Sequence, residues 1–197
     1  MKKLFLGAAI AMSSLTFAQQ FGAKAGVNVS TISDDSDLNQ KSKVGYYAGV
    51  FMNAPIAENF SIQPEVLYNN LGAKLTEDSE TSTLNLDYVT VPVMFQYNAT
   101  PNFYLEAGPE FGFLVNSKVK SDNEFTEAIG NEIYKKDNMN SFNFGLGLGA
   151  GYYFTPNIGI TARYVAGFTD VTKENSDVTT NAKNRNNTFQ AGLAFKF

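Results

Sequence analysis

Residues 142–154 read FNFGLGLGAGYYF, and this stretch decides the fold of the chain. From Phe142 to Phe154 every second residue is aromatic or aliphatic, whereas the residues between them are mostly glycine. Alternation with period two is typical of a β-strand with two different faces. Four glycines in a row would make a poor hydrophobic core, but they suit the inner wall of a narrow barrel, where side chains from the far wall need room. The stretch therefore predicts a barrel strand whose apolar face points outward.

The same alternation recurs in both directions along the chain. Most segments are close to nine to eleven residues, the length that a tilted strand needs to cross a membrane, and the less regular segment 83–97 is longer. The sequence therefore predicts eight strands, at about 21–30, 44–53, 60–69, 83–97, 103–114, 142–154, 158–165 and 188–197.

The distribution of polar residues separates a membrane barrel from a soluble one. A soluble eight-stranded barrel, such as a secreted lipocalin-like carrier, has the same period but places its charges outside. Here the apolar face of segments 142–154 and 188–197 contains no charge, and a Lys or Arg facing lipid at mid-membrane would cost about 2–4 kcal/mol. Tyrosines near the strand ends suit interfacial girdles. They are Tyr46, Tyr68, Tyr97, Tyr152 and Tyr164. We therefore expect an all-β fold, an eight-stranded antiparallel transmembrane β-barrel of the outer-membrane type.

The connections alternate in length. Short turns with Pro or Asn are expected at 54–59, 98–102 and 155–157, and longer polar loops at 31–43, 70–82, 116–140 and 169–187. Short periplasmic turns opposite longer outer loops are the arrangement of outer-membrane barrels. An even strand count then places both ends of the barrel on the periplasmic side.

Two features interrupt this regular pattern. Leu84 and Leu86 lie in the opposite phase to the apolar face of residues 89–97, which predicts a bulge or an early end of the membrane zone. Pro64, Pro92 and Pro109 fall inside strands, where each loses a ladder hydrogen bond, so we expect local bulges there.

The first 18 residues have the pattern of a secretory signal peptide. Lys2 and Lys3 precede an apolar stretch, and a small-residue cleavage signature ends at Ala18. The predicted domains are thus a signal peptide at 1–18 and a barrel at 19–197. Residues 19–197 carry 13 basic and 19 acidic side chains, a formal charge of −6, which argues against a nucleic-acid partner.

Several motifs resemble the small outer-membrane β-barrel family often called PorT-family or porin-family proteins. The resembling stretches are Gly45–Phe51, Ser61–Tyr68, Tyr88–Val93, Tyr104–Pro109, Gly145–Tyr153 and Phe195–Phe197. The resemblance implies an eight-stranded barrel in the bacterial outer membrane, whose C-terminal aromatic residue is similar to the signal that such proteins present to the barrel-assembly machinery. Thr90 departs from the acidic residue expected in its motif, which implies one lumen charge fewer.

If the polar faces point inward, three positive and three negative side chains share the lumen. Eight strands leave an interior only wide enough for side chains to fill, and buried charges without partners are costly. We therefore expect a network of salt bridges that closes the barrel, formed by Lys24, Glu65, Glu106, Glu110, Arg163 and Lys196. Glu65 and Arg163 each lie five residues past a short turn on opposite strands, so they are expected to meet, with Lys24, Glu106 and Lys196 nearer the periplasmic end. A narrow conduit lined by the same charges is the alternative.

Three classes of function follow from this fold. The first is a structural or binding barrel that displays its outer loops to an extracellular ligand or an envelope protein, with membrane lipid around it. Its expected contact loop lies within 116–140 and includes Lys118, Phe125, Ile129, Tyr134, Lys135 and Lys136. The second is a porin-like passive channel or a component of a secretion apparatus.

The third class is a membrane enzyme. With no His and no Cys, Ser–His and Cys–His arrangements are impossible. The carboxylates of the outer loops are not paired at a telling spacing, and Asp34-Asp35-Ser36-Asp37 lacks the Gly and the distal Glu of an EF-hand. An all-carboxylate catalytic site is the alternative that the sequence leaves open, because Glu and Asp occur in the outer loops. The sequence otherwise predicts no catalytic site, no metal and no cofactor.

Overall fold

The structure is a computed structural model that describes residues 19–33, 40–77, 80–121, 123–134, 136–171 and 185–197. Within these residues, eight antiparallel strands pair in sequence order and β8 returns to β1, which closes a barrel and confirms the predicted fold. The predicted signal peptide and the Asp34–Asp37 segment lie outside the described residues. The elements are β1 (Gln20–Ser33), β2 (Gln40–Ala57), β3 (Phe60–Glu77), β4 (Glu80–Asn98), β5 (Phe103–Ser121), α2 (Glu124–Ile133), η1 (Lys136–Asn138), β6 (Phe142–Tyr153), β7 (Ile158–Gly167) and β8 (Arg185–Lys196).

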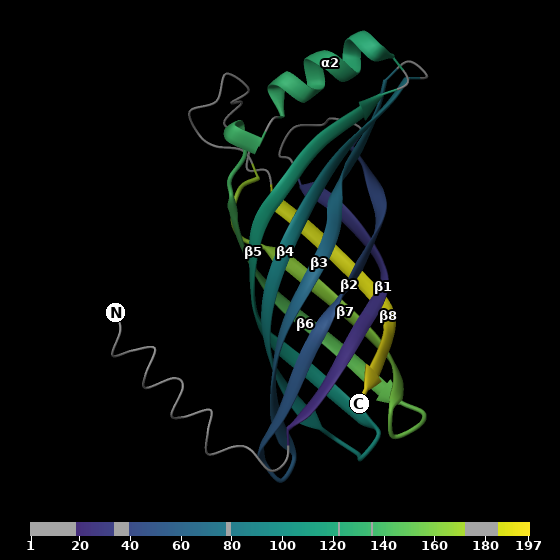
Figure 1. Ribbon diagram of the computed structural model, residues 1–197, viewed down its shortest axis with the longest axis vertical. Coiled ribbons are helices and arrows are strands. Elements are labelled where there is room, and N and C mark those ends of the chain that lie inside the picture. The colour runs from purple at the N-terminus through teal and green to yellow at the C-terminus, as the bar shows by residue number, and fades with distance from the viewer. Residues whose placement is uncertain (1–18, 34–39, 78–79, 122, 135, 172–184) are drawn as a thin grey trace, which may run out of the picture.

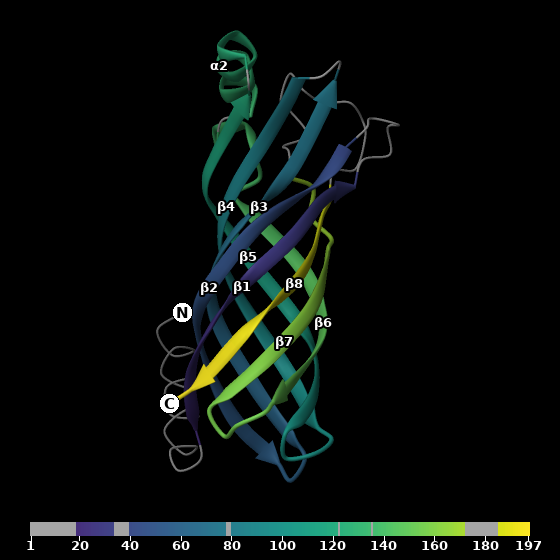
Figure 2. The same cartoon turned by 90° about the vertical axis from the view of Figure 1, so that its right-hand side faces the viewer.

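The two ends of the barrel differ. The three short turns lie at one end, together with the start of β1 and the C-terminus (Figure 1). At the other end β3, β4 and β5 rise above the rest of the wall and carry α2 (Figures 1 and 2). We call these two ends the turn end and the extended end.

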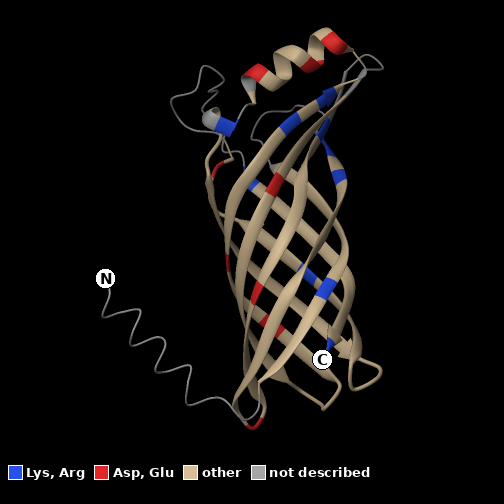
Figure 3. Cartoon of the chain, in the orientation of Figure 1, with Lys and Arg blue, Asp and Glu red and all other residues tan. Residues whose placement is uncertain are grey.

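The apolar faces point outward, as the sequence predicts. Leu148 is 68% exposed and Leu193 57% exposed on the outer surface. On the inner face, Glu65 is 1% exposed and Arg163 4% exposed. Figure 3 shows where charged residues lie along the strands, some in the middle of the wall and others at the extended end. A belt of exposed apolar side chains around a polar interior is the arrangement that suits lipid outside and water exclusion inside.

Four strands are much longer than expected. β2 and β3 have 18 residues each, and β4 and β5 have 19 each. The expected loop at 70–82 is therefore wrong, because β3 runs to Glu77 and β4 begins at Glu80. The expected loop at 116–140 is also wrong as a whole, because it begins as strand and then forms α2. The expectation counted only strand with an apolar outward face, whereas at the extended end the apolar residues of β3, β4 and β5 point inward.

Leu84 and Leu86 do not interrupt the alternation of β4. They point inward in the same phase as Tyr88, and the three are at most 8% exposed. The bulge lies instead in the neighbouring strand, where Asp87 pairs with Asn116 but Tyr88 pairs with Leu114. The phase of β4 looked broken because its inward residues change from polar to apolar at the extended end.

The prolines cause gaps in the ladders but no bulges. On both sides of each gap the strands keep one register, so two residues per strand are left unpaired and no residue is inserted. The expected bulges at Pro64, Pro92 and Pro109 are therefore wrong. A proline removes one donor without changing strand length, and the two strands resume pairing beyond it. The pairs that flank the gaps are Phe51–Glu65 and Ala54–Ile62, Pro64–Val93 and Leu67–Thr90, and Pro92–Glu110 and Phe95–Ala107.

An apolar cluster fills the extended end on its inner side. Its members come from four strands and from the segments that follow α2 and β7. All are at most 8% exposed, and Tyr134 packs against them. They are Ile32, Leu71, Ala73, Leu84, Leu86, Tyr88, Leu114, Val119, Met139 and Val171. This outer core holds the projecting strands together where no lipid surrounds them.

Helix α2 covers an open strand edge. β6 pairs with β5 only as far as Phe113, so the rest of β5 lacks a neighbour on that side. Asn131 replaces it: its Oδ1 accepts from the Val119 amide at 2.9 Å, and its Nδ2 donates to the Val119 carbonyl at 3.2 Å. Asn123 caps the start of the helix by accepting from the Phe125 amide at 2.9 Å. Among the described residues, no helix combines the length and the apolar character needed to span a membrane.

The outward face of β6 gives a test of the barrel's orientation. We expect Leu148→Arg to lower the unfolding free energy by about 2–4 kcal/mol, because it places a charge against lipid hydrocarbon. Urea titration of the protein folded into phosphatidylcholine vesicles measures this change. Lys136→Arg, an exposed residue of η1 outside the barrel wall, is the control and should have no effect. Equal stability of both variants would contradict the outward orientation.

The contact between α2 and β5 gives a second test. We expect Asn131→Ala to lower the local opening free energy at Val119 by about 1–2 kcal/mol, because two hydrogen bonds to the strand edge are lost. Hydrogen exchange of the Val119 amide reports this directly. Phe125→Ala, on the exposed side of the helix, serves as the control. Unchanged exchange at Val119 would show that α2 does not protect the edge.

Candidate functional site: the lumen and the extended end

Arg163 lies at the centre of a buried ionic cluster in the lumen. Its Nη1 and Nη2 donate to the two carboxylate oxygens of Glu65 at 3.0 and 2.7 Å. Its Nε donates to Glu106 Oε1 at 2.8 Å. β7, β3 and β5 supply these three residues, so the pairs join separate parts of the wall. Such forked contacts between a guanidinium and carboxylates are both strong and directional.

Lys24 completes the charge balance of this cluster. From β1 its Nζ donates to Glu65 Oε1 at 2.6 Å. The cluster thus joins two cations and two carboxylates, all at most 4% exposed. The sequence-based expectation placed Lys24 and Glu106 nearer the periplasmic end than Glu65 and Arg163. In the structure all four are in contact, because the strands tilt and long side chains bridge the difference in height.

Amide side chains surround the ionic cluster and occupy its remaining lone pairs. Gln63 Nε2 donates to Glu65 Oε1 at 2.8 Å, and Gln96 Nε2 donates to Glu106 Oε2 at 3.0 Å. Asn53 Nδ2 in turn donates to Gln96 Oε1 at 2.7 Å. Buried charges are tolerated when additional hydrogen bonds satisfy them. These amides therefore belong to the network as much as the charges do, although only the charges stood out in the sequence.

A second, uncharged chain of hydrogen bonds crosses the lumen. Gln190 on β8 donates to Asn69 Oδ1 on β3 at 2.9 Å, and Asn69 donates to Thr90 Oγ1 on β4 at 2.8 Å. All three side chains are at most 3% exposed. Thr90 is the position where the family resemblance implies an acidic residue. Here the hydroxyl is paired with an amide, so this level of the lumen is closed without a charge.

Aromatic rings close the turn end of the lumen and explain the inner glycines. Phe51, Tyr104, Tyr153 and Ala194 form a buried cluster. A Cβ on Gly151 would lie 2.4 Å from the Tyr104 ring, and Tyr104 and Gly151 are partners in the β5–β6 register. Gly151 thus makes room for a ring of the adjacent strand, whereas a Cβ on Gly147 would lie 3.2 Å from Met94 of β4, two strands away. The sequence-based expectation was room for side chains of the far wall.

Glu110 and Lys196 lie outside the ionic cluster. Glu110 is 8% exposed, and its Oε2 has no hydrogen-bond partner among the described residues. Lys196 places its Nζ 3.9 Å from the centre of the Tyr153 ring, a cation–π contact at the turn end. The sequence predicts one network of six lumen charges. In the structure Lys24, Glu65, Glu106 and Arg163 form one cluster, and Glu110 and Lys196 lie outside it.

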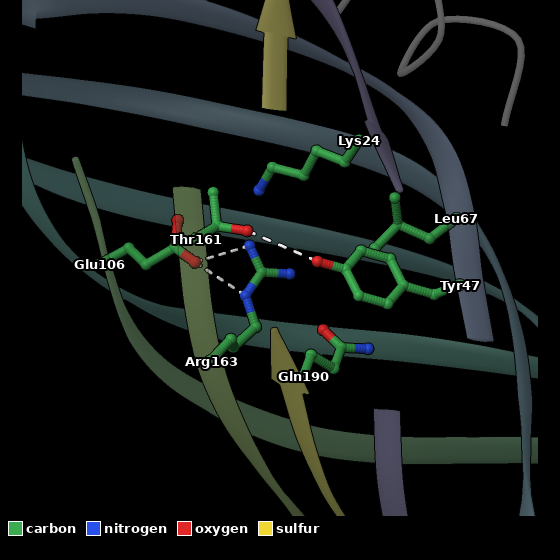
Figure 4. Close-up of a pocket in the computed structure, with 7 residues that line it drawn as sticks. All are labelled: Lys24, Tyr47, Leu67, Glu106, Thr161, Arg163 and Gln190. Carbon is green, nitrogen blue, oxygen red and sulfur yellow. Dashed lines mark hydrogen bonds and ion pairs between the residues drawn. The ribbon is translucent and has the colours of Figure 1, made fainter. Parts of the chain in front are cut away.

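A small cavity lies in the lumen beside the ionic cluster. It lies among the labelled residues of Figure 4, with room for about one water molecule. Its lining combines the ionic cluster with Tyr47, Leu67, Thr161 and Gln190. In the described part of the chain, no group of three or more acidic side chains is arranged to hold a metal ion. The arrangement suits pairing of side chains more than binding of a solute.

The residues expected to form an outer contact loop are spread over three elements. Lys118 is exposed on β5, and Phe125 and Ile129 are exposed on α2. Lys136 is exposed on η1, whereas Tyr134 packs against the outer core. Lys135 lies outside the described residues. The structure thus brings Phe125 and Ile129 together on one helix and gives Tyr134 a packing role.

The barrel geometry agrees with that of solved outer-membrane proteins. The attachment invasion locus protein Ail of Yersinia pestis, solved with the heparin analogue sucrose octasulfate, is 14% identical, with a TM-score of 0.51 over 92% of this chain and 100% of Ail. Neisserial surface protein A is also 14% identical, with a TM-score of 0.56 over 91% of this chain and 99% of that one. At this identity the likeness concerns the fold. No protein of curated function is significantly similar in sequence.

A family model gives the assignment. The model described as outer membrane protein beta-barrel domain matches residues 17–173, most of the chain. The PorT and porin labels are not part of this match and stay a prediction. The closed eight-stranded barrel with its outward apolar belt is the fold that this family description predicts. The chain belongs to the outer membrane protein β-barrel domain family and is located in the bacterial outer membrane.

Proposed function

We propose that this protein is a non-conducting, non-enzymatic barrel that acts through contacts at its extended end. The observation that carries the proposal is the contrast between a lumen closed by paired side chains and a projecting surface that leaves apolar side chains exposed. The turn end then faces the periplasm and the extended end faces outward, since short turns are periplasmic in this class of barrel.

The lumen supports the non-conducting part of the proposal. Three successive levels block it: the aromatic cluster at the turn end, the ionic cluster with its amides, and the outer core at the extended end. A solute would have to break the contacts of Arg163 with Glu65 and Glu106, which are desolvated. Breaking a buried ion pair costs about 3–5 kcal/mol, and a solute would also have to displace the packed side chains of the other two levels.

The extended end supports the binding part. Phe125 is 74% exposed and Ile129 45% exposed, and they lie four residues apart on α2. Residues at this spacing share one face of a helix. A helix fixed to a strand edge by Asn131 presents that face on a rigid support. We propose that α2 contacts an extracellular ligand or another envelope protein.

Two further partners belong to the proposal. Membrane lipid surrounds the apolar belt of the barrel wall. The barrel-assembly machinery is the proposed partner during biogenesis, and the exposed aromatic side chains Phe195 and Phe197 are the proposed contact. No nucleic acid, metal or cofactor is proposed.

Planar-bilayer recording tests the closed lumen. We expect no steady conductance from the reconstituted protein, because each level of the lumen is filled. Steady conductance that is lost or changed in Arg163→Gln would contradict this and would favour a channel. The double variant Glu106→Gln with Arg163→Gln leaves Lys24 paired with Glu65, so no charge of the cluster is left unpaired in case the single variant does not fold. Lys196→Gln, outside the ionic cluster, is the matched control.

Site-specific photocrosslinking in intact cells tests the contact surface. With a photoreactive phenylalanine at position 125, we expect a discrete crosslinked product that Ile129→Ser weakens, because both side chains share one face. The same probe at Ala99, in a turn at the opposite end, is the control. Absence of any product specific to position 125 would mean that α2 is only solvated.

A further inference from the structure

Four lysines gather on the outward face of the extended end. The register pairs Lys41 of β2 with Lys74 of β3, Lys74 with Thr83 of β4, and Thr83 with Lys120 of β5. Directly paired residues point to the same side of a sheet. Lys118 lies two residues before Lys120 on the same side, so the four lysines form one patch, which we call the lysine row.

The lysine row points away from the outer core. Ala73 and Val119, the sequence neighbours of Lys74 and Lys120, are buried in the outer core, so the lysines point to the opposite side. All four lysines are exposed. Figure 3 shows Lys and Arg gathered on the projecting strands below α2. The helix occupies the edge of β5 through Asn131, which leaves the lysine face open.

Within the described part of the chain, acidic side chains do not pair with these lysines. Asp87 lies on the same face, but the amides of Asn70 and Asn116 donate to its two carboxylate oxygens at 2.6 and 3.0 Å. Like charges directly opposite each other destabilise a sheet, and Lys41 and Lys74 are such a pair. An anion held between them would relieve this repulsion.

The position of the lysine row identifies the kind of anion. Tyr46 and Tyr68 form an aromatic pair on the outward face, with ring centres 6.2 Å apart, where an interfacial girdle belongs. Lys74 follows Tyr68 by six residues on the same strand and face. At the rise and tilt of a barrel strand this places Lys74 about 15 Å further from the membrane centre. The row is thus continuous with the lipid-facing wall and lies at the depth of a large polar headgroup.

We propose that Lys41, Lys74, Lys118 and Lys120 bind phosphate groups on the saccharide headgroups of outer-leaflet lipid. Neighbouring strands are about 4.8 Å apart, so Lys41 and Lys74 can hold one phosphate between them. Lys74 and Lys120 are two strands apart, about 10 Å, and reach a second. The contact fixes the depth and tilt of the barrel through charge, independently of any partner of α2.

Titration of the protein in zwitterionic detergent micelles with lipopolysaccharide tests the proposal. Each basic residue near an anionic surface contributes about fivefold in affinity, so we expect the triple variant Lys41→Gln, Lys74→Gln and Lys120→Gln to bind about 100-fold more weakly. Lys136→Gln, an exposed lysine outside the row, should bind as the parent does. The same lipid stripped of its phosphates should bind the parent as weakly as the triple variant.

Unfolding by urea gives a second readout whose sign separates a binding role from a structural one. In zwitterionic micelles Lys74→Gln should raise the urea midpoint, because it removes the repulsion with Lys41. With phosphorylated lipopolysaccharide present, the same variant should have a lower midpoint than the parent. Loss of stability under both conditions, or no dependence on phosphate, would overturn the proposal. Equal stabilisation by free inorganic phosphate or by soluble heparin would also overturn it, since the site would then recognise an anion that is not lipid-borne.

Discussion

Closure of eight strands into a ring is the constraint on which the rest of the structure depends. In lipid every backbone donor and acceptor must be paired within the protein, and a closed barrel does this without a free edge. Closure with so few strands leaves a lumen that side chains must fill. Each inward residue then has to pack or find a partner, and the pairing of Arg163 with Glu65 and Glu106 follows from this requirement. Where the ring stops and β5 runs on alone, Asn131 supplies the missing partner from a helix.

The interior changes character along the axis. Rings at the turn end, charges in the middle and aliphatic side chains at the extended end each satisfy the same demand for a filled lumen by different chemistry. The charged level is the most specific, because a carboxylate such as Glu65 needs several donors at fixed positions, supplied here by Lys24, Gln63 and Arg163. The apolar level carries no such demand and can continue above the membrane, where water surrounds the wall.

The strands and their faces could be predicted from the sequence because the period-two alternation and the apolar outward residues are visible as a pattern of residue types. Residues such as Leu148 and Arg163 were therefore assigned to the correct sides. The length of β3 and β4 could not be predicted, because beyond the membrane the outward residues are polar and the pattern of an apolar outward face disappears. The amide partners Gln63 and Gln96 were missed for a related reason: a glutamine on an inward face has no charge to mark it. The position of Lys24 and Glu106 along the barrel axis depends on strand tilt, which cannot be obtained from the number of residues between a turn and a side chain.

The two surfaces of the extended end answer to different physical demands. On its inner side the outer core makes β3, β4 and β5 stable without lipid, so their outward side chains are not needed for packing. Lys41 and Lys74 are then free to face each other at a cost in repulsion, and Phe125 is free to stay exposed at a cost in hydration. The buried residues of the outer core stabilise these strands enough to offset both unfavourable terms. A filled interior and an outer surface with exposed apolar and cationic side chains are therefore two results of one arrangement, in which the buried residues supply the stability.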